Sequence, residues 1–265
     1  MSEKLRIAVI GLGEAGSLIA AGLQKQGAEV IGYDTAKIKY PPVPIAASAV
    51  EAVQDADVVF SINSATVSIR VAQQLEPHLK ADALYCDLNT GTPSLKKRLA
   101  QIAPEGSFVD VAVMMPVAEL AEKTPMAVAG PGAKLFMDLL GDFDLNLDYV
   151  SDVAGDAANR ELLRSMLTKG MAAVATDYLW AAKAMGLEDW AIEELKNEFD
   201  ASSATTALRY LSDMQQHAKR RQVEIANLNE VLGDANYQST MVHGIEATLT
   251  LVVHSKKVPF AHLGE

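Results

Sequence analysis

Residues 5–16 read Leu-Arg-Ile-Ala-Val-Ile-Gly-Leu-Gly-Glu-Ala-Gly, an apolar run followed by three glycines with the spacing G-x-G-x-x-G. The apolar run predicts a β-strand, and the pattern after it predicts a helix over residues 14–26. In this spacing the first glycine permits a tight turn, the second lets a pyrophosphate approach the backbone, and the third lets the helix pack closely against the strand. The phosphate then meets the N–H groups at the start of the helix. We therefore expect the turn to bind a dinucleotide through Gly11, Leu12, Gly13, Glu14, Ala15 and Gly16.

An acidic residue closes the second predicted strand, which covers residues 29–33. Asp34 follows Gly16 by 18 positions. A carboxylate there is expected to accept hydrogen bonds from ribose hydroxyls and to repel a 2′-phosphate, which favours NAD(H) over NADP(H). Lys37 and Lys39 leave NADP(H) open, because either lysine could face a phosphate. The alternative for Asp34 is an ordinary turn residue at the end of a strand.

Short apolar runs alternate with helical patterns through the first half of the chain. Further strands are expected over residues 57–62, 83–88, 107–113, 126–129 and 145–150, with helices between them. This alternation indicates right-handed crossovers and a mainly parallel sheet. After about Ala154 no convincing strand signal remains. The expected fold class is therefore α/β, with an N-terminal Rossmann-type domain over residues 1–154 and an all-α domain over residues 155–265.

Capping residues predict where helices of the second half begin and end. Helix starts are expected at Ser203 or Thr205 and at Asn236. Gly186 and Gly233 are expected to lie just past helix ends.

The composition describes a folded, soluble chain of 265 residues, with 49% apolar and 22% charged residues. Lys plus Arg number 23 and Asp plus Glu number 34, so the net charge of −11 disfavours nucleic acid and acidic membrane surfaces as partners. Cys86 is the one cysteine, which excludes an intrachain disulfide and a zinc site built on cysteine pairs. No metal-ligand spacing is present among the histidines, so no metal is expected. Because the N-terminus lacks a signal-peptide pattern and no apolar stretch is long enough to span a bilayer, we expect a cytoplasmic protein.

Three short motifs connect the chain to a known family: Asp87-Leu88-Asn89-Thr90, Val109 to Val113, and the pair Lys169-Gly170. With the glycine turn and a helical C-terminus, the chain resembles the β-hydroxyacid dehydrogenases, which include 6-phosphogluconate dehydrogenase. It is most similar to the phosphogluconate-dehydrogenase-like branch with its own helical C-terminal domain. The resemblance implies a nicotinamide-dependent oxidoreductase with Asn89 and Thr90 beside the nicotinamide. Ser61 and Asn63, at the end of another predicted strand, are expected in the same cofactor site.

The loop after Asp110 is the substrate loop that the resemblance implies. The family usually has Ser-Gly-Gly there, whereas this chain has Val113-Met114-Met115-Pro116. Two thioethers offer bulk and apolar surface, so we expect a substrate that is larger or less polar than a small hydroxyacid, or one that binds elsewhere. The alternative is that the methionines fill the core. His243, on the last predicted helix, is a further candidate substrate residue.

The family carries a catalytic lysine early in the interdomain helix and an asparagine four residues later. By the resemblance, Glu161 and Ser165 occupy those positions, so the expected ammonium is absent. Glu161 could act as an acid or base in a buried environment, and its alternative is a solvated helix carboxylate. Lys169 continues the same helix face and could reach a ligand from another side, or it could stabilise a bend at Gly170.

We therefore expect an NAD(P)-dependent enzyme that transfers hydride between nicotinamide and a small hydroxyacid, alcohol or carbonyl substrate at the interdomain cleft. A homodimer through the C-terminal helices is expected as well. One alternative is an imine reductase, because imine reductases of this superfamily also lack the lysine. Another is a catalytically silent NAD(P)-binding sensor or interaction protein.

Overall fold

The structure is a computed structural model that describes residues 4–200, 204–255 and 258. The chain divides into two compact units, Met1–Met166 and Leu167–Glu265. The domain boundary expected near residue 155 stays a prediction. Among the described residues, none of the helices has both the length and the apolar composition that crossing a bilayer requires.

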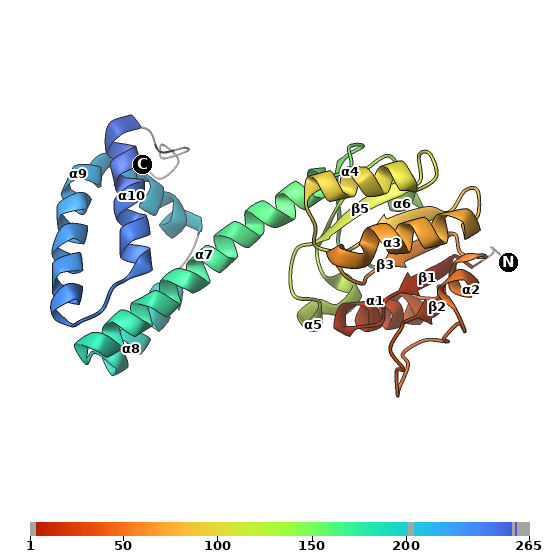
Figure 1. Cartoon of the computed structure of the whole chain (residues 1–265), viewed down its shortest axis with the longest axis horizontal. Helices are drawn as coiled ribbons and strands as arrows, with labels where there is room; N and C mark the ends of the chain where they lie inside the picture. Colours follow the sequence, from red (N-terminus) through yellow and green to blue (C-terminus); the bar gives the residue numbers. More distant parts are fainter. Residues whose placement is uncertain (1–3, 201–203, 256–257, 259–265) are drawn as a thin grey trace. The chain divides into compact units, whose positions relative to one another are not determined.

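The first unit is built on a seven-stranded sheet with the order β2-β1-β3-β4-β5-β6-β7 (Figure 1). Its strands are β1 (Arg6–Ile10), β2 (Glu29–Tyr33), β3 (Val58–Ser61), β4 (Leu84–Asp87), β5 (Phe108–Val113), β6 (Met126–Ala129) and β7 (Leu147–Ser151). All neighbouring strands are parallel except β5 and β6, which are antiparallel. The expected α/β class with a mainly parallel sheet is confirmed.

Helices pack against both faces of this sheet. They are α1 (Glu14–Lys25), α2 (Ala49–Val53), α3 (Ala65–Leu75), α4 (Pro93–Ile102), α5 (Val117–Leu120) and α6 (Ala133–Leu139), with short 3₁₀ turns at Glu76–His78 and Ala121–Lys123. One apolar core holds side chains of α1, α5 and α6, and the other holds side chains of α2, α3 and α4. Because successive strand residues point to opposite faces, Ile7 and Val9 lie in the first core while Ala8 and Ile10 lie in the second. Burial on both faces explains why the strand sequences are continuously apolar.

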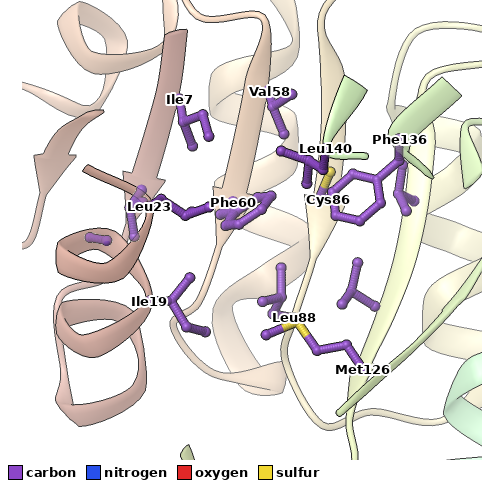
Figure 2. Close-up of a cluster of buried hydrophobic side chains, with 14 of the residues drawn as sticks. Ile7, Ile19, Leu23, Val58, Phe60, Cys86, Leu88, Met126, Phe136 and Leu140 are labelled. Atoms are coloured by element: carbon purple, nitrogen blue, oxygen red, sulfur yellow. The ribbon is translucent and has the colours of Figure 1, made fainter. Parts of the chain in front are cut away.

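Cys86 lies inside the first of these cores, between Phe60 and Phe136 among other apolar side chains (Figure 2). Its side chain is fully buried, and burial raises the pKa of the thiol well above its usual value. A buried neutral thiol is unreactive, so Cys86 serves as a packing residue.

Among its described residues, the regular secondary structure of the second unit is all helical. It contains most of α7 (Asp156–Met185), together with α8 (Glu188–Asp200), α9 (Ala204–Asp234) and α10 (Thr240–Ser255). Gly186 follows α7 with φ +69°, which confirms the expected helix end. The expected start at Ser203 lies outside the described residues, and the side chain of Thr205, inside α9, is not described either.

Two other expected helix boundaries are wrong. Gly233 lies inside α9 rather than past its end. Asn236 does not start a helix but ends one: it adopts φ +55°, and the next residue, Tyr237, donates its N–H to the carbonyl of Leu232 at 2.9 Å. This is the left-handed helix ending in which asparagine replaces glycine. The following helix is capped instead by Ser239, whose Oγ accepts the N–H of Val242 at 2.9 Å.

Candidate functional site

The three glycines of the turn between β1 and α1 differ in what surrounds them. Gly11 has φ +106°, and a Cβ there would lie 2.0 Å from the carbonyl oxygen of Ile62. A Cβ on Gly16 would lie 2.0 Å from the carbonyl oxygen of Gly11. At Gly13, by contrast, no atom comes within 4 Å of the Cβ position. The fold therefore requires the first and third glycines, whereas the second leaves open space in front of the backbone.

Asp34 ties the end of β2 to the glycine turn. Its Oδ2 accepts the N–H of Leu12 at 2.7 Å, and its Oδ1 accepts the N–H of Ala36 at 2.8 Å. A hollow of about 430 Å³ opens beside it, lined by residues including Thr35, Lys37 and Ile45. Each carboxylate oxygen can accept a further hydrogen bond, so this role in the turn is compatible with contact to a ribose.

The strand register brings the other expected cofactor residues to the same edge of the sheet. Ile10 of β1 pairs with Tyr33 and with Ser61, and Ser61 in turn pairs with Asp87. These positions are the carboxyl ends of parallel strands, where open α/β sheets bind ligands.

Asn63 and Asn89 are hydrogen-bonded to each other at this edge. The Oδ1 of Asn89 accepts the backbone N–H of Asn63 at 2.7 Å, and the Nδ2 of Asn63 donates to the Oγ of Ser61 at 2.9 Å. Asn89 also donates its Nδ2 to Asp87 Oδ1 at 2.5 Å and is buried. The loops after β3 and β4 are thereby held against each other.

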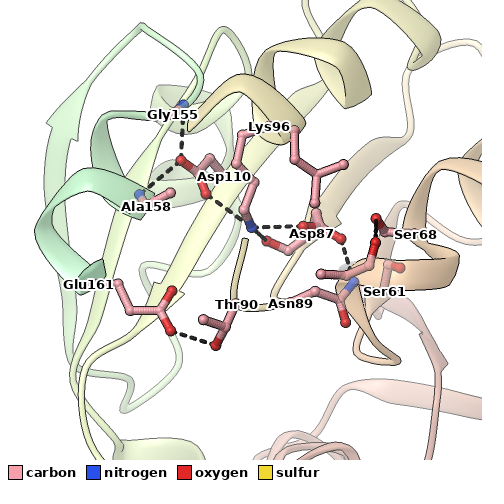
Figure 3. A network of polar contacts seen from close by, with 12 residues as sticks. Ser61, Ser68, Asp87, Asn89, Thr90, Lys96, Asp110, Gly155, Ala158 and Glu161 are labelled. Carbon is pink, nitrogen blue, oxygen red and sulfur yellow. Dashed lines mark hydrogen bonds and ion pairs between the residues drawn. The ribbon is translucent and has the colours of Figure 1, made fainter. Parts of the chain in front are cut away.

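Thr90 and Glu161 meet although 71 residues separate them in the chain. The hydroxyl of Thr90 donates to Oε1 of Glu161 at 2.6 Å (Figure 3). Thr90 is exposed and Glu161, on α7, is half-buried. Ser165 is half-buried on the same helix, one turn beyond Glu161. The structure thus places the carboxylate of Glu161 directly against an expected cofactor residue.

The structure gives burial or packing for the other expected site residues whose side chains it describes. Met114 packs against Ala112, Ala127, Ala129 and Ala157, so it fills part of the core as the alternative for the methionines predicted. Val113 and Met115 are half-buried. His243 is exposed on α10, in the second unit. Lys169 belongs to α7, but its side chain lies outside the described part of the structure.

Sequence reasoning missed a buried cluster of charges beneath this edge. The Nζ of Lys96, on α4, lies 2.7 Å from Asp87 Oδ2 and 3.2 Å from Asp110 Oδ1, and all three side chains are 0% exposed. Burial opposes the charged form of Lys96, but the attraction of the two carboxylates outweighs it, so the pKa of Lys96 is raised. Burial raises the pKa of Asp87 against the opposing effect of Lys96. The ammonium therefore stays charged inside the protein.

The cluster continues into the start of α7. Oδ2 of Asp110 accepts the N–H of Gly155 at 3.0 Å and the N–H of Ala158 at 3.1 Å (Figure 3). The signal that could have revealed the cluster is the presence of two aspartates inside apolar strands, since buried carboxylates need a cationic partner. Nothing in the sequence singles out Lys96, because Lys97 and Arg98 follow it.

Comparison with known proteins gives two domain matches. Residues 6–134 match the NAD binding domain of 6-phosphogluconate dehydrogenase. Residues 182–252 match DUF1932, a domain of unknown function.

Relatives and solved structures agree with these matches. An uncharacterized 28.5 kDa protein from Methanothermus fervidus is 25% identical over 245 residues, which cover 90% of this chain and 95% of that protein. A conserved protein of unknown function with structural similarity to 3-hydroxyacid dehydrogenases is 25% identical, with a TM-score of 0.61 and coverage of 96% and 100%. An imine reductase variant from Myxococcus stipitatus in complex with NAD+ is 17% identical, with a TM-score of 0.79 and coverage of 97% of each chain, and it shares the fold. The N-terminal part of the chain is therefore similar to the NAD binding domain of 6-phosphogluconate dehydrogenase, and a helical C-terminal region is similar to DUF1932, in agreement with the resemblance seen in the sequence.

Proposed function

We propose that the protein is an NAD(P)-dependent oxidoreductase that transfers hydride between nicotinamide and a small organic substrate. The observation that carries this proposal is the open backbone at Gly13, in a turn whose other two glycines have no room for a side chain. A Cβ at Gly13 would project into that space, which is the space a pyrophosphate needs. The residues of the turn therefore fit a dinucleotide. When bound, the cofactor supplies the hydride chemistry, and the protein supplies binding and orientation.

Each group at the sheet edge has a role in this proposal. The turn from Gly11 to Gly16 holds the pyrophosphate with its N–H groups, and Asp34 accepts hydrogen bonds from the adenosine ribose. Asn63 and Thr90 orient the nicotinamide end, and the buried side chains of Ser61 and Asn89 hold Asn63 in place. Glu161 accepts the Thr90 hydroxyl hydrogen at 2.6 Å, so it can hold or move a proton where the substrate reacts.

We propose NAD(H) as the preferred cofactor, because a carboxylate at Asp34 disfavours a 2′-phosphate. Calorimetric titration is expected to give a Kd for NADH at least about tenfold lower than for NADPH. The variant Lys37→Met separates the two possibilities: it lowers affinity for NADPH alone if that ammonium faces the phosphate. Tighter binding of NADPH would overturn the role of Asp34. If neither NADH nor NADPH binds, the proposal that the protein is an NAD(P)-dependent enzyme is wrong.

The substrate class has two candidates, which a turnover panel distinguishes. Hydroxyacids and alcohols are the first. Reduction of a C=N bond is the second, and it is favoured by the carboxylate of Glu161, whose charge stabilises an iminium cation and opposes an acidic substrate. Met115, which is half-buried, adds apolar surface. Cofactor binding with no turnover of either class would favour a sensor or interaction protein.

We further propose that the protein forms a homodimer through its C-terminal helices. Large apolar side chains are exposed on these helices, among them Trp180 on α7 at 60%, Trp190 on α8 at 58% and Leu251 on α10 at 69%. Exposed apolar surface of this kind marks an interaction site. Light scattering is expected to give twice the mass of the 28.3 kDa chain, and a monomer would refute the proposal.

A further inference from the structure

The start of α7 has no capping side chain of its own. Gly155 precedes the first helical residue and has φ +101°, where a Cβ would lie 2.9–3.0 Å from atoms of Pro93. The serine, threonine or aspartate that commonly caps a helix therefore cannot stand at this position. Yet the first N–H groups of a helix need acceptors when they are buried.

Asp110 supplies the missing cap from another element. Its Oδ2 accepts N–H groups from Gly155 and from Ala158, at 3.0 Å and 3.1 Å. These are the capping position and the third helical residue, the two donors that a capping box satisfies with two side chains. Here one carboxylate from β5 satisfies both, across 45 and 48 residues of chain.

Lys96 fixes the capping carboxylate to the strand that leads to Thr90. Its Nζ lies 3.2 Å from Asp110 Oδ1 and 2.7 Å from Asp87 Oδ2, and it also donates to the carbonyl of Asp87 at 2.9 Å. Asp87 ends β4, three residues before Thr90. One buried ammonium thus connects the start of α7 to the loop that carries Thr90.

We propose that Asp110, held by Lys96, is a positioning residue that fixes Glu161 against Thr90. Glu161 follows Ala158 by three residues, which is less than one helical turn, so a movement of the first turn of α7 moves Glu161 with it. That Asp110 holds the first turn of α7 follows from these contacts alone. Its effect on the rate of hydride transfer rests on the function proposed above.

The first test is Asp110→Asn, followed by hydrogen exchange. An amide has one oxygen, and its NH2 group would repel the buried ammonium of Lys96 if it took the place of Oδ1. We therefore expect the oxygen to turn toward Lys96 and to leave the two N–H groups of α7 without their acceptor. Exchange at Gly155 and Ala158 is expected to become about tenfold faster in a variant that remains folded by circular dichroism. The matched control is Asp156→Asn, which removes a charge from the same helical turn and leaves Asp110 in place. Equal exchange in Asp110→Asn and the native protein would overturn the proposal.

A second measurement needs no variant, and it decides the matter if Asp110→Asn does not fold. In the native protein the amides of Gly155 and Ala158 are expected to be protected, although the first N–H groups of a helix ordinarily have no intrahelical acceptor. Unprotected amides at both positions would overturn the capping role.

The effect on the reaction is tested by separating binding from hydride transfer. Asp110→Asn is expected to change the Kd for NADH by less than about twofold, because the glycine turn is untouched, while the single-turnover rate of hydride transfer falls at least about tenfold. An unchanged rate together with faster exchange at α7 would overturn the positioning role. If the native protein binds no cofactor, the proposed function fails, whereas the exchange measurements still decide whether Asp110 holds α7.

Discussion

Gly13→Ala is expected to leave the fold intact while lowering the affinity for NADH by about 100-fold, or roughly 3 kcal/mol. The backbone at Gly13 has φ −64°, which alanine adopts without strain, and nothing lies within 4 Å of the new Cβ. The methyl group therefore costs the folded protein nothing. It does occupy the space through which a pyrophosphate reaches the backbone. Thermal unfolding and calorimetric titration of the same preparation measure the two effects.

The matched variant Gly11→Ala should instead destabilise the fold. Its Cβ would lie 2.0 Å from the carbonyl oxygen of Ile62, at a φ of +106° that L-residues rarely adopt. We expect a loss of roughly 3 kcal/mol or more in the free energy of unfolding. If Gly13→Ala binds NADH as well as the native protein, the dinucleotide does not approach through this turn.

Glu161→Gln is expected to lower the rate of hydride transfer by about 10²- to 10⁴-fold. The glutamine keeps an oxygen that can accept the Thr90 hydroxyl, so the contact at 2.6 Å can persist while the charge and the exchangeable proton are lost. The Kd for NADH should change by less than about twofold, since Glu161 is not part of the glycine turn. Single-turnover measurements of NADH oxidation with a substrate from the panel separate the two quantities.

The control for this variant is Asp148→Asn. Asp148 pairs with Arg160, the residue before Glu161, at 2.7 Å on the surface. Removing that charge alters the same helix without touching Thr90, and exposed pairs contribute little. Equal activity of Glu161→Gln and the native protein would make Glu161 an ordinary solvated carboxylate.

The elements of the first unit could be predicted from the sequence because their apolar residues are buried on two faces. Residues 29–33 and 126–129 form the expected strands with the expected bounds. The antiparallel pairing of β6 with β5 could not be predicted, because strand direction depends on the path of the connecting chain. Helix ends in the second unit were harder to predict from the sequence, because asparagine is favourable both at a helix start and at a left-handed helix end. Asn236 takes the second role.

Some parts of the candidate site could likewise be predicted from the sequence, and others could not. The glycine turn and the pair Asn89-Thr90 are local patterns, so they could be found from sequence. The contact of Thr90 with Glu161 depends on where α7 begins, and that start is held by Asp110, an aspartate inside an apolar strand. Such long-range contacts have no local pattern. They follow only when the sheet brings distant segments together.

The capping of α7 from β5 also decides where the chain can be cut. A fragment that stops at residue 154 retains the buried Asp110 but lacks the N–H groups of Gly155 and Ala158, which leaves Oδ2 without the donors it has in the whole protein. A fragment that stops at Met166 retains both donors and coincides with the end of the first compact unit. The first turns of α7 thus belong to the first compact unit and complete its hydrogen bonding. Domain exchange between related proteins should place its junction beyond them.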